Sequence, residues 1–156
     1  MTEPSQPETA LRIAPISPEP GAPVDETLVR AVITLWERCG LTRPWNDPRA
    51  DLRFALASPV STVLLGFRGD RLVASVMVGH DGHRGVVYYV SVDPEFGRHG
   101  YGREIMVAAE AWLAERGVPK LNLMIRTENA AVAAFYEALG YQVEERLVMA
   151  KWLKAS

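Results

Sequence analysis

The sequence contains one cysteine, Cys39, among 156 residues, which excludes an internal disulfide and fits a reducing compartment. It also lacks the run of about 20 apolar residues that a membrane-spanning helix needs. The first ten residues, MTEPSQPETA, have neither the basic region nor the apolar run of a signal peptide. We therefore expect a cytoplasmic protein that does not associate with a membrane.

An excess of basic residues is also missing. The chain has 17 Lys and Arg against 19 Asp and Glu, for a net charge of −2, which argues against a nucleic-acid partner. With 48% hydrophobic and 23% charged residues, the composition is that of a globular protein. We expect residues 1–9, which are polar and rich in proline, to be a disordered tail, and residues 10–156 to form a single domain.

Hydrophobic periodicity divides the chain into strand and helix segments. Residues 11–16 alternate as a short strand does, and Pro15 restricts that strand to a sheet edge. Helical spacing begins at Val24 and ends at Gly40. The other expected elements are a short helix around 52–56, strands at 62–68, 72–79 and 85–92, a helix over 105–113 ended by Gly117, a strand at 120–126, a helix at 129–139 and a final strand at 141–152.

The order of these elements predicts the fold class. Strands 85–92 and 120–126 flank a helix with the spacing of a βαβ unit, so we expect them to be parallel neighbours. Gly69-Asp70 and Asp81-Gly82 are hairpin turn signals, which make the earlier strands antiparallel. The prediction is an α/β (α+β) domain with a mixed, mostly antiparallel sheet and helices on both faces.

Three glycines, Gly97, Gly100 and Gly102, lie between a predicted strand and the start of a helix. Glycine lets backbone N–H groups approach a ligand closely, and a helix start adds unpaired donors and a partial positive charge. With Arg98 and Arg103, this loop predicts a pyrophosphate site. A plain turn explains the glycines equally well, and their spacing matches neither a P-loop nor the dinucleotide-binding pattern.

A second segment adds specificity. Asn129 and Tyr136 are seven residues apart, so they lie on the same side of a helix, two turns from one another. Singly, each residue has an ordinary structural explanation: Asn129 is a good N-cap, Tyr136 a core aromatic and Gly140 a C-cap. Their joint position after the glycine loop and the next strand is what makes the combination informative.

Together these segments resemble the GNAT superfamily of acetyltransferases, over roughly residue 63 to the end. The residues that carry the resemblance are Val92-x-Pro94-Glu95-Phe96 with Gly100-x-Gly102, and Asn129, Ala134, Tyr136 and Gly140-Tyr141. Segments 32–39, 43–48 and 81–85 are similar to one bacterial member in particular. The resemblance implies a GNAT-like fold with a splayed parallel strand pair, and an N-acetyltransferase that moves an acetyl group from acetyl-CoA to a primary amine by direct transfer in a ternary complex.

The resemblance also implies the site. The pantetheine arm of acetyl-CoA is expected to pair with a strand backbone like an added strand, and the pyrophosphate to bind N–H groups of the glycine loop. The implied cofactor-binding residues are Val90, Ser91, Val92, Arg98, His99, Gly100, Tyr101, Gly102, Arg103, Asn129 and Tyr136. Tyr136 is also the implied catalytic acid, which protonates the departing thiolate. No metal is implied.

The sequence departs from the family pattern at one pair of residues. The family usually has Arg or Gln followed directly by Gly, whereas here Gly97 precedes Arg98. A non-glycine residue at position 98 is expected to strain the loop if φ is positive there, and to weaken acetyl-CoA binding.

The general base is not assigned. Strand stretches 86–92 and 121–125, where relatives often place a Glu, contain no carboxylate. The remaining candidates are Tyr88, Tyr89, Glu37, Asp81 and His83. A missing strong base favours weakly basic acceptors such as α-amines, which are partly neutral already.

The acceptor is expected to be a small-molecule or peptide amine that contacts segments covering the cleft. The candidate residues are Trp36, Arg43, Trp45, Asn46, His83 and Tyr88. Trp36 also fits a buried stripe, because it follows Val32 at helical spacing. His80 and His83 make a poor zinc set, so we expect no metal. The final strand leaves a homodimer open, because sheet edges invite pairing.

Two other classes of function compete with the enzyme. A non-catalytic acyl-CoA-binding or sensor module on the same fold would explain Arg98 and the missing carboxylate, although Tyr136 argues against it. An unrelated nucleotide-binding α/β domain would use the glycine loop alone, and selective binding of ATP or NAD would reveal it.

Overall fold

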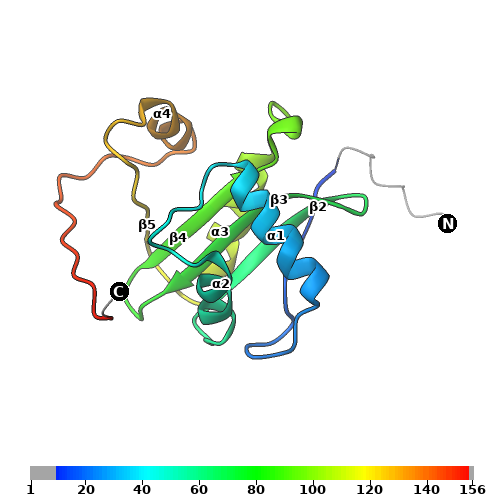
Figure 1. Cartoon of the computed structure of the whole chain (residues 1–156). Helices are drawn as coiled ribbons and strands as arrows, with labels where there is room; N and C mark the ends of the chain where they lie inside the picture. The colour runs from blue at the N-terminus through cyan, green and yellow to red at the C-terminus, as the bar shows by residue number, and fades with distance from the viewer. Residues whose placement is uncertain (1–9, 155–156) are drawn as a thin grey trace. The chain divides into compact units, whose positions relative to one another are not determined.

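The computed structural model describes residues 10–154, and Figure 1 shows the whole chain. The chain divides into two units, Met1–Leu123 and Met124–Ser156, and each is described by itself. The predicted tail at residues 1–9 lies outside the described residues. One domain over residues 10–156 stays a prediction.

A five-stranded sheet forms the centre of the first unit, with the strands in chain order from β1 to β5. The first three neighbouring pairs are antiparallel, and β4 and β5 are parallel, as the predicted βαβ unit requires. The strands are β1 Arg12–Pro15, β2 Ser61–Arg68, β3 Arg71–His80, β4 Gly85–Val92 and β5 Leu121–Asn122. The predicted mixed sheet is confirmed, and β1, which contains Pro15, is an edge strand as expected.

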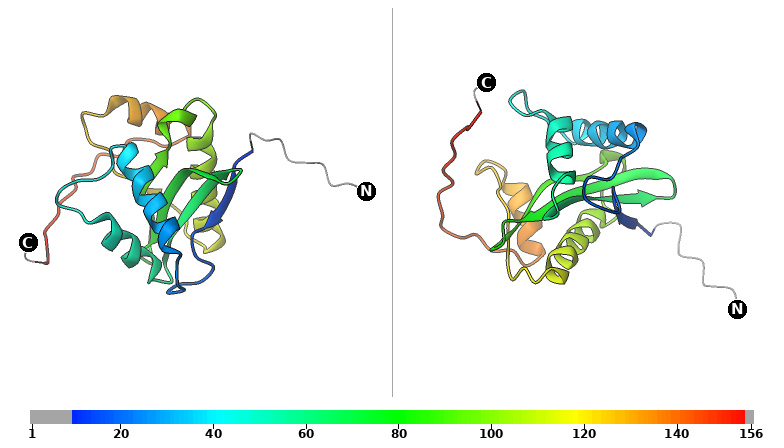
Figure 2. Two further views of the ribbon diagram at one scale, coloured as in Figure 1. Left: turned by 45° about the vertical axis from the view of Figure 1, so that its right-hand side comes forward. Right: turned by 90° about the horizontal axis from the view of Figure 1, so that it is seen from below.

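Helices cover both faces of this sheet, which confirms the predicted layering. Helices α1 and α2 lie on one face and α3 on the other, as the right-hand view of Figure 2 shows. The helices of the unit are α1 Glu26–Arg38, α2 Pro48–Leu56, the short 3-10 helix η1 Pro94–Phe96 and α3 Tyr101–Glu115. The side chains of Asp25 and Asp47 cap α1 and α2 by accepting hydrogen bonds from first-turn N–H groups.

The core has one layer on each side of the sheet. On the side of α1 and α2 the buried residues are Val29, Val32, Trp36, Leu52, Ala55, Val63 and Leu65. On the other side α3 buries Ile105, Met106, Ala109, Trp112 and Leu113. A Cβ at Gly85 would lie 2.5 Å from Leu113, so glycine at the start of β4 is what lets α3 pack this closely on the sheet.

The last strand of the sheet is much shorter than predicted. The sequence predicts a strand over residues 120–126, whereas β5 contains only Leu121 and Asn122, paired with Gly85 and Val86 of β4. After Asn122 the chain no longer pairs with β4. Apolar alternation predicts an extended chain, but a strand also needs a hydrogen-bonded neighbour, and β4 provides one for two residues only.

The second unit contains α4, Ala130–Ala138, with Asn129 as its N-cap, as predicted. The predicted final strand at 141–152 is wrong, because residues 141–153 form no helix or strand. Val143, Leu147, Met149 and Leu153 are exposed there. Their spacing suits an extended chain, but residues 141–153 have no hydrogen-bonded neighbouring strand. The possible homodimer, which was argued from this strand, stays a prediction.

Candidate active site

The glycine loop joins β4 to α3 through η1, and its backbone differs from an ordinary turn. Arg98 and Gly100 both have positive φ, at 67° and 77°, whereas Gly97 has φ −59°. Gly100 is the N-cap of α3 and has no side chain to cap the first-turn N–H groups. A side chain caps each of α1, α2 and α4 instead. The start of α3 therefore leaves room for an external acceptor of hydrogen bonds.

The expected strain at Arg98 is present. Its φ of 67° is in the left-handed region, where a non-glycine residue is disfavoured by about 1 kcal/mol or more. Gly97 occupies an ordinary conformation, and a Cβ placed on it would meet only the Pro94 carbonyl oxygen at 3.8 Å. Glycine is therefore at the position with an ordinary φ and arginine at the position with a positive φ, the reverse of what the backbone favours. The order of the two residues is also the reverse of the family pattern.

His99 and Tyr101 stabilise the loop from within. The His99 Nδ1 atom lies 3.1 Å from the carbonyl oxygen of Phe96 and 3.0 Å from that of Gly97, so this nitrogen carries the proton and donates. Its ring stacks on Tyr101, with the ring centroids 5.3 Å apart. Tyr101 itself is buried. Of the residues predicted to bind the cofactor here, Arg98, His99, Gly100 and Arg103 are exposed.

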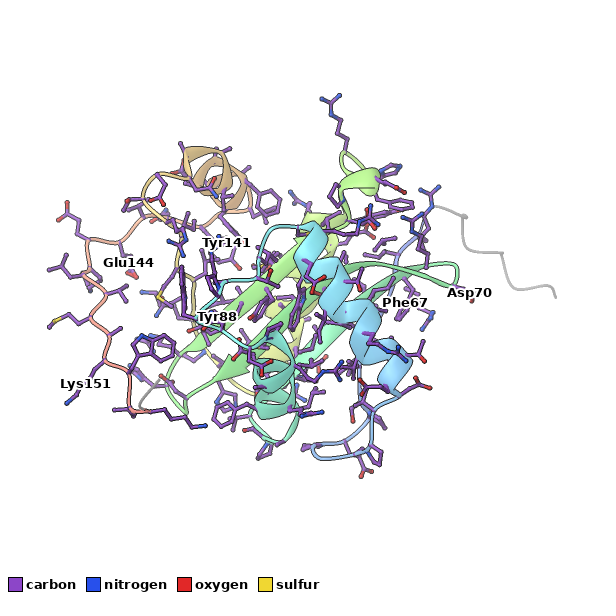
Figure 3. The ribbon with its side chains drawn as sticks, viewed as in Figure 1. Phe67, Asp70, Tyr88, Tyr141, Glu144 and Lys151 are labelled. Carbon is purple, nitrogen blue, oxygen red and sulfur yellow. The ribbon has the colours of Figure 1, made fainter. Side chains whose placement is uncertain are left out.

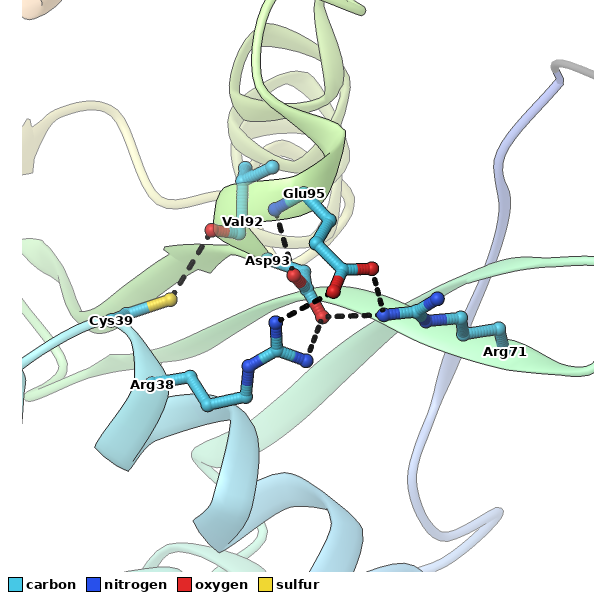
Figure 4. A network of polar contacts seen from close by, with 6 residues as sticks. All are labelled: Arg38, Cys39, Arg71, Val92, Asp93 and Glu95. Carbon is cyan, nitrogen blue, oxygen red and sulfur yellow. Dashed lines mark hydrogen bonds and ion pairs between the residues drawn. The ribbon is translucent and has the colours of Figure 1, made fainter.

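A cluster of two carboxylates and two guanidinium groups holds the chain where it leaves β4 (Figure 4). Asp93 is buried, and its Oδ2 lies 2.9 Å from Arg38 of α1 and 3.4 Å from Arg71 of β3. Its Oδ1 accepts the N–H of Glu95, which in turn pairs with Arg71 at 2.8 Å. We call these four residues the Asp93 cluster. It ties the start of the glycine loop to a helix and to a neighbouring strand.

The edge of β4 that faces β5 is open over most of its length. β5 pairs with Gly85 and Val86, so in the described part of the chain residues 87–92 have no strand partner on that side. A β-bulge between Ser75 and Met77 leaves Tyr89 and Val90 opposite one residue of β3, and Tyr89 has φ 52°. The bulge therefore includes Val90 and lies directly before Ser91 and Val92; these three residues are the ones predicted to pair with the co-substrate.

A buried polar network fixes that bulge. The Trp36 indole donates to the Ser75 hydroxyl at 2.9 Å, and Ser75 donates to the Tyr89 carbonyl oxygen at 3.2 Å. The Ser91 hydroxyl completes the group at 2.6 Å from that of Ser75. Trp36 is fully buried and stacks on the Tyr89 ring, with centroids 3.8 Å apart. Trp36 is therefore too buried to contact an acceptor, and it acts on the site by holding Tyr89 in place.

The Tyr89 hydroxyl contacts a carboxylate, that of Asp51, which sequence analysis did not select as a site residue. It donates to Asp51 Oδ2 of α2 at 2.7 Å. Burial raises the pKa of Tyr89, and the hydrogen bond to Asp51 and the charges of Asp51 and Asp47 raise it further. Tyr89 keeps its proton at neutral pH and is a poor candidate for the base. Asp51 lies 38 residues before Tyr89, and no local motif signals the contact.

The other predicted acceptor residues are only partly brought together. Arg43 donates to the carbonyl oxygens of Gly40 and Thr42 within its own loop, which also includes Asn46. Trp45 in the same loop is 57% exposed, and Tyr88 on β4 is 46% exposed. Figure 3 shows Tyr88 among the labelled side chains. These four residues are partly or largely accessible on the unit that contains the open strand edge.

The hairpin after β3 is built as a turn. Asp81 accepts the N–H groups of Arg84 and His83, and these bonds lower its pKa, which makes it a weaker base. The exposed His83 lies on the same turn. Within residues 10–154, no group of three His, Cys, Asp or Glu side chains lies close enough to hold a metal ion.

In the second unit, the Asn129 side chain accepts the N–H of Val132 at 3.4 Å and so begins α4. Tyr136 is buried and makes edge contacts with the rings of Phe135 and Tyr141. Burial raises the pKa of Tyr136, so its phenol is protonated at neutral pH and is able to donate a proton.

None of the helices in residues 10–154 is both long and apolar enough to span a membrane.

Comparison with known proteins identifies the family. Residues 30–141 match the model of the acetyltransferase (GNAT) family. An acetyltransferase of Yersinia enterocolitica, YE1169, is 42% identical over 122 residues, which cover 78% of this chain and 86% of that protein. The Pectobacterium atrosepticum acetyltransferase ECA0875 is 43% identical over 123 residues, covering 79% and 87%.

Solved structures share the fold at lower identity. The aminoglycoside acetyltransferase AAC(6')-Iy, solved with a CoA-containing bisubstrate analogue, superposes with a TM-score of 0.74 at 14% identity, covering 92% of this chain and 98% of that one. The ribosomal-protein-S18-alanine N-acetyltransferase of Escherichia coli gives a TM-score of 0.67 at 22% identity, covering 84% and 77%. With a family model and close relatives in agreement with the open strand edge and the glycine loop, the chain belongs to the GNAT family of acetyltransferases.

Proposed function

We propose that this protein is an N-acetyltransferase that moves the acetyl group of acetyl-CoA directly to a primary amine. The observation that carries the proposal is the continuity of the open β4 edge with the glycine loop and the start of α3. An extended amide-bearing chain fits an open strand edge, and a pyrophosphate fits a helix start. Acetyl-CoA has both parts, in that order.

The loop residues fit the pyrophosphate. Gly100 has φ 77° and a Cβ at this position would meet nothing within 4 Å, so the backbone is open to a ligand. The N–H groups at the start of α3 and the exposed side chains of Arg98 and Arg103 supply donors and positive charge. Arg98 contributes this positive charge although its own backbone is strained by a positive φ.

The strand edge fits the pantetheine arm. The amides of the arm are expected to pair with the backbone at Val90 and Val92, beside Tyr89 of the bulge. The buried Trp36 and Ser75 hold that bulge in one conformation, which reduces the ordering needed on binding. The thioester would then lie near Tyr89 at the splayed end of the β4–β5 pair.

The reaction needs a neutral amine and a protonated leaving group. The neutral amine nitrogen attacks the thioester carbonyl carbon and the carbon–sulfur bond breaks. The nitrogen gives up one proton to water, the CoA sulfur takes up one proton from an acid of the protein, and water returns a proton to that acid. We assign the role of this acid to the Tyr136 phenol, which retains its proton because burial raises its pKa. A thiol has a pKa of about 8.5 in water, below that of a phenol. A thiolate that leaves into a dry site is more basic than in water, so the difference between the pKa values of the thiol and the phenol becomes smaller.

The acceptor class is an amine of a small molecule or a peptide. Structural neighbours act on aminoglycosides and on the alanine of a ribosomal protein, which supports amines as a class. The test is release of CoA thiol from acetyl-CoA against a panel of polyamines, aminoglycosides and peptides with free α-amines. Acetylation of at least one amine, verified by mass, is expected. Binding of acetyl-CoA with no transfer to any amine would favour the non-catalytic module.

A further inference from the structure

The side-chain hydrogen bond between Tyr89 and Asp51 has no role in the co-substrate binding proposed above. Asp51 is on α2, whereas Tyr89 is at the bulge of β4, and the Tyr89 hydroxyl donates to Asp51 Oδ2 at 2.7 Å. The Asp51 carboxylate is therefore held at the end of the Tyr89 side chain, which extends from the backbone of β4. Asp51 belongs to α2, which lies on the face of the sheet opposite α3 (Figure 2).

Tyr89 cannot move away from this position easily. Its ring stacks on the buried Trp36, with an interplanar angle of 13°, and its carbonyl oxygen accepts the Ser75 hydroxyl. A side chain that is fixed at its ring, its hydroxyl and its backbone holds its partner in a defined place. The position of the Asp51 carboxylate is thus set by the same bulge at which the co-substrate edge begins.

Asp51 has no charged side-chain partner in the described part of the chain. The ion pairs of residues 10–154 do not include it, and Arg49 of the same helix pairs with Glu26. The first turn of α2, to which Asp51 belongs, supplies only a partial positive charge. Asp47 is used as the N-cap of α2. A carboxylate accepts about four hydrogen bonds, and the one bond described comes from a neutral phenol. A partly buried carboxylate of this kind is stabilised by a cationic donor.

We propose that Asp51 binds an ammonium group of the acceptor other than the amine that reacts, and so selects acceptors with a second, cationic amine, with Tyr89 as its positioning residue. The inference rests on the proposed transfer from acetyl-CoA, because the location of the thioester near Tyr89 comes from it. Asp51 does not replace the general base that relatives often place on β4 or β5. Its role is recognition of a cation, and the reacting amine gives up its proton to water.

The test compares acceptors of different charge with acetyl-CoA as the donor. Spermidine keeps ammonium groups while one of its amines reacts in the neutral form, whereas the single nitrogen of propylamine or aniline must be neutral to attack. For Asp51→Asn we expect the KM of spermidine to rise about 10- to 100-fold, as the loss of a charge-assisted hydrogen bond predicts. The KM of propylamine, aniline and acetyl-CoA should change less than about twofold, and Asp51→Glu should partly restore the spermidine KM.

Two further variants separate binding from structure. Asp70→Asn removes an exposed carboxylate at the β2–β3 hairpin tip, far from Tyr88 in Figure 3, and should leave every KM unchanged. Tyr89→Phe removes the positioning bond but keeps the charge, so its effect should be smaller than that of Asp51→Asn. Equal loss for aniline and spermidine in Asp51→Asn, or an unchanged spermidine KM, would overturn the inference while the proposed transfer stands.

Calorimetry decides the inference without catalysis. Spermidine is titrated into wild-type protein and into Asp51→Asn in the presence of CoA, with thermal unfolding recorded to verify that both are folded. Weaker binding by the variant supports Asp51 as the cation site, even if no acetyl transfer is detected and the proposed function fails. Equal binding, or none to the wild type, contradicts it.

Discussion

The guanidinium of Arg38, on α1, lies 2.9 Å from the buried carboxylate of Asp93, 55 residues later at the end of β4 (Figure 4). This contact links the helix layer over one face of the sheet to the residue from which the glycine loop departs. Arg71 joins the same carboxylate from β3. The direction of the loop is therefore fixed by side chains that do not themselves belong to it.

Replacing Asp93 by Asn should destabilise the protein and loosen the loop. The substitution removes charge from a buried group with two cationic partners and an N–H donor, so the free energy of unfolding should fall by roughly 2 kcal/mol. Glu95→Gln is the matched control, because Glu95 is more exposed, and it should lose much less. Denaturant unfolding of both variants is the measurement, and equal losses would contradict the central position of Asp93.

The transposed Gly97-Arg98 pair predicts separate effects on stability and affinity. Arg98→Gly should raise the free energy of unfolding by about 0.5–1 kcal/mol, because it relieves a positive φ at a non-glycine residue. It should also raise the Kd for acetyl-CoA severalfold, because a charge near the pyrophosphate is lost.

The double exchange of these two residues completes that test. With Arg at 97 and Gly at 98 the loop keeps its charge, and a side chain at 97 fits an ordinary φ without a close contact. Thermal unfolding and calorimetric titration should show a protein as stable as Arg98→Gly with wild-type affinity or better. A destabilised Arg98→Gly would show that the arginine makes contacts worth more than its strain.

Tyr136→Phe should lower kcat by about 10²–10⁴-fold and change the Kd for acetyl-CoA far less. The phenol must be protonated to donate, and burial raises its pKa above the ordinary value of 10. Activity that depends on Tyr136 is therefore lost only as pH rises through that raised pKa. Rate measurements from pH 6 to 10.5 test the prediction, and an unchanged kcat in the variant would remove Tyr136 from the role of acid.

Cys39 should react slowly with alkylating reagents in the folded protein. Burial raises the pKa of the thiol, which donates to the Val92 carbonyl oxygen at 3.2 Å, so less thiolate is present at pH 8 than in the unfolded chain. Intact-mass analysis after iodoacetamide treatment should show much faster modification in denaturant, with a single adduct because the chain has one cysteine. Equal rates would indicate that the thiol is exposed.

Local chemistry made much of the fold predictable from the sequence. Pro15 removes a backbone donor, which restricts its strand to an edge, and β1 lies at an edge. Asn129 has the side chain of an N-cap and begins α4. The backbone strain at Arg98 was also predictable, because it depends only on having a non-glycine residue where φ is positive. Each of these features depends on a residue and its immediate neighbours.

Features that depend on distant partners were not predictable in the same way. Residues 123–126 have strand-like composition, but pairing with β4 ends at Asn122. The same applies to residues 141–152, where apolar alternation predicts a strand and none is formed. Asp51 was missed because its relevance comes from Tyr89, which only the tertiary fold brings within 2.7 Å.

The most direct test of the account is a calorimetric titration of the purified protein with acetyl-CoA, beside CoA, ATP and NAD. An open β4 edge that continues into a pyrophosphate site predicts binding of acetyl-CoA and CoA at micromolar concentration, with ATP and NAD at least tenfold weaker because they have no pantetheine arm. Failure to bind acetyl-CoA, or equal binding of ATP or NAD, would contradict it.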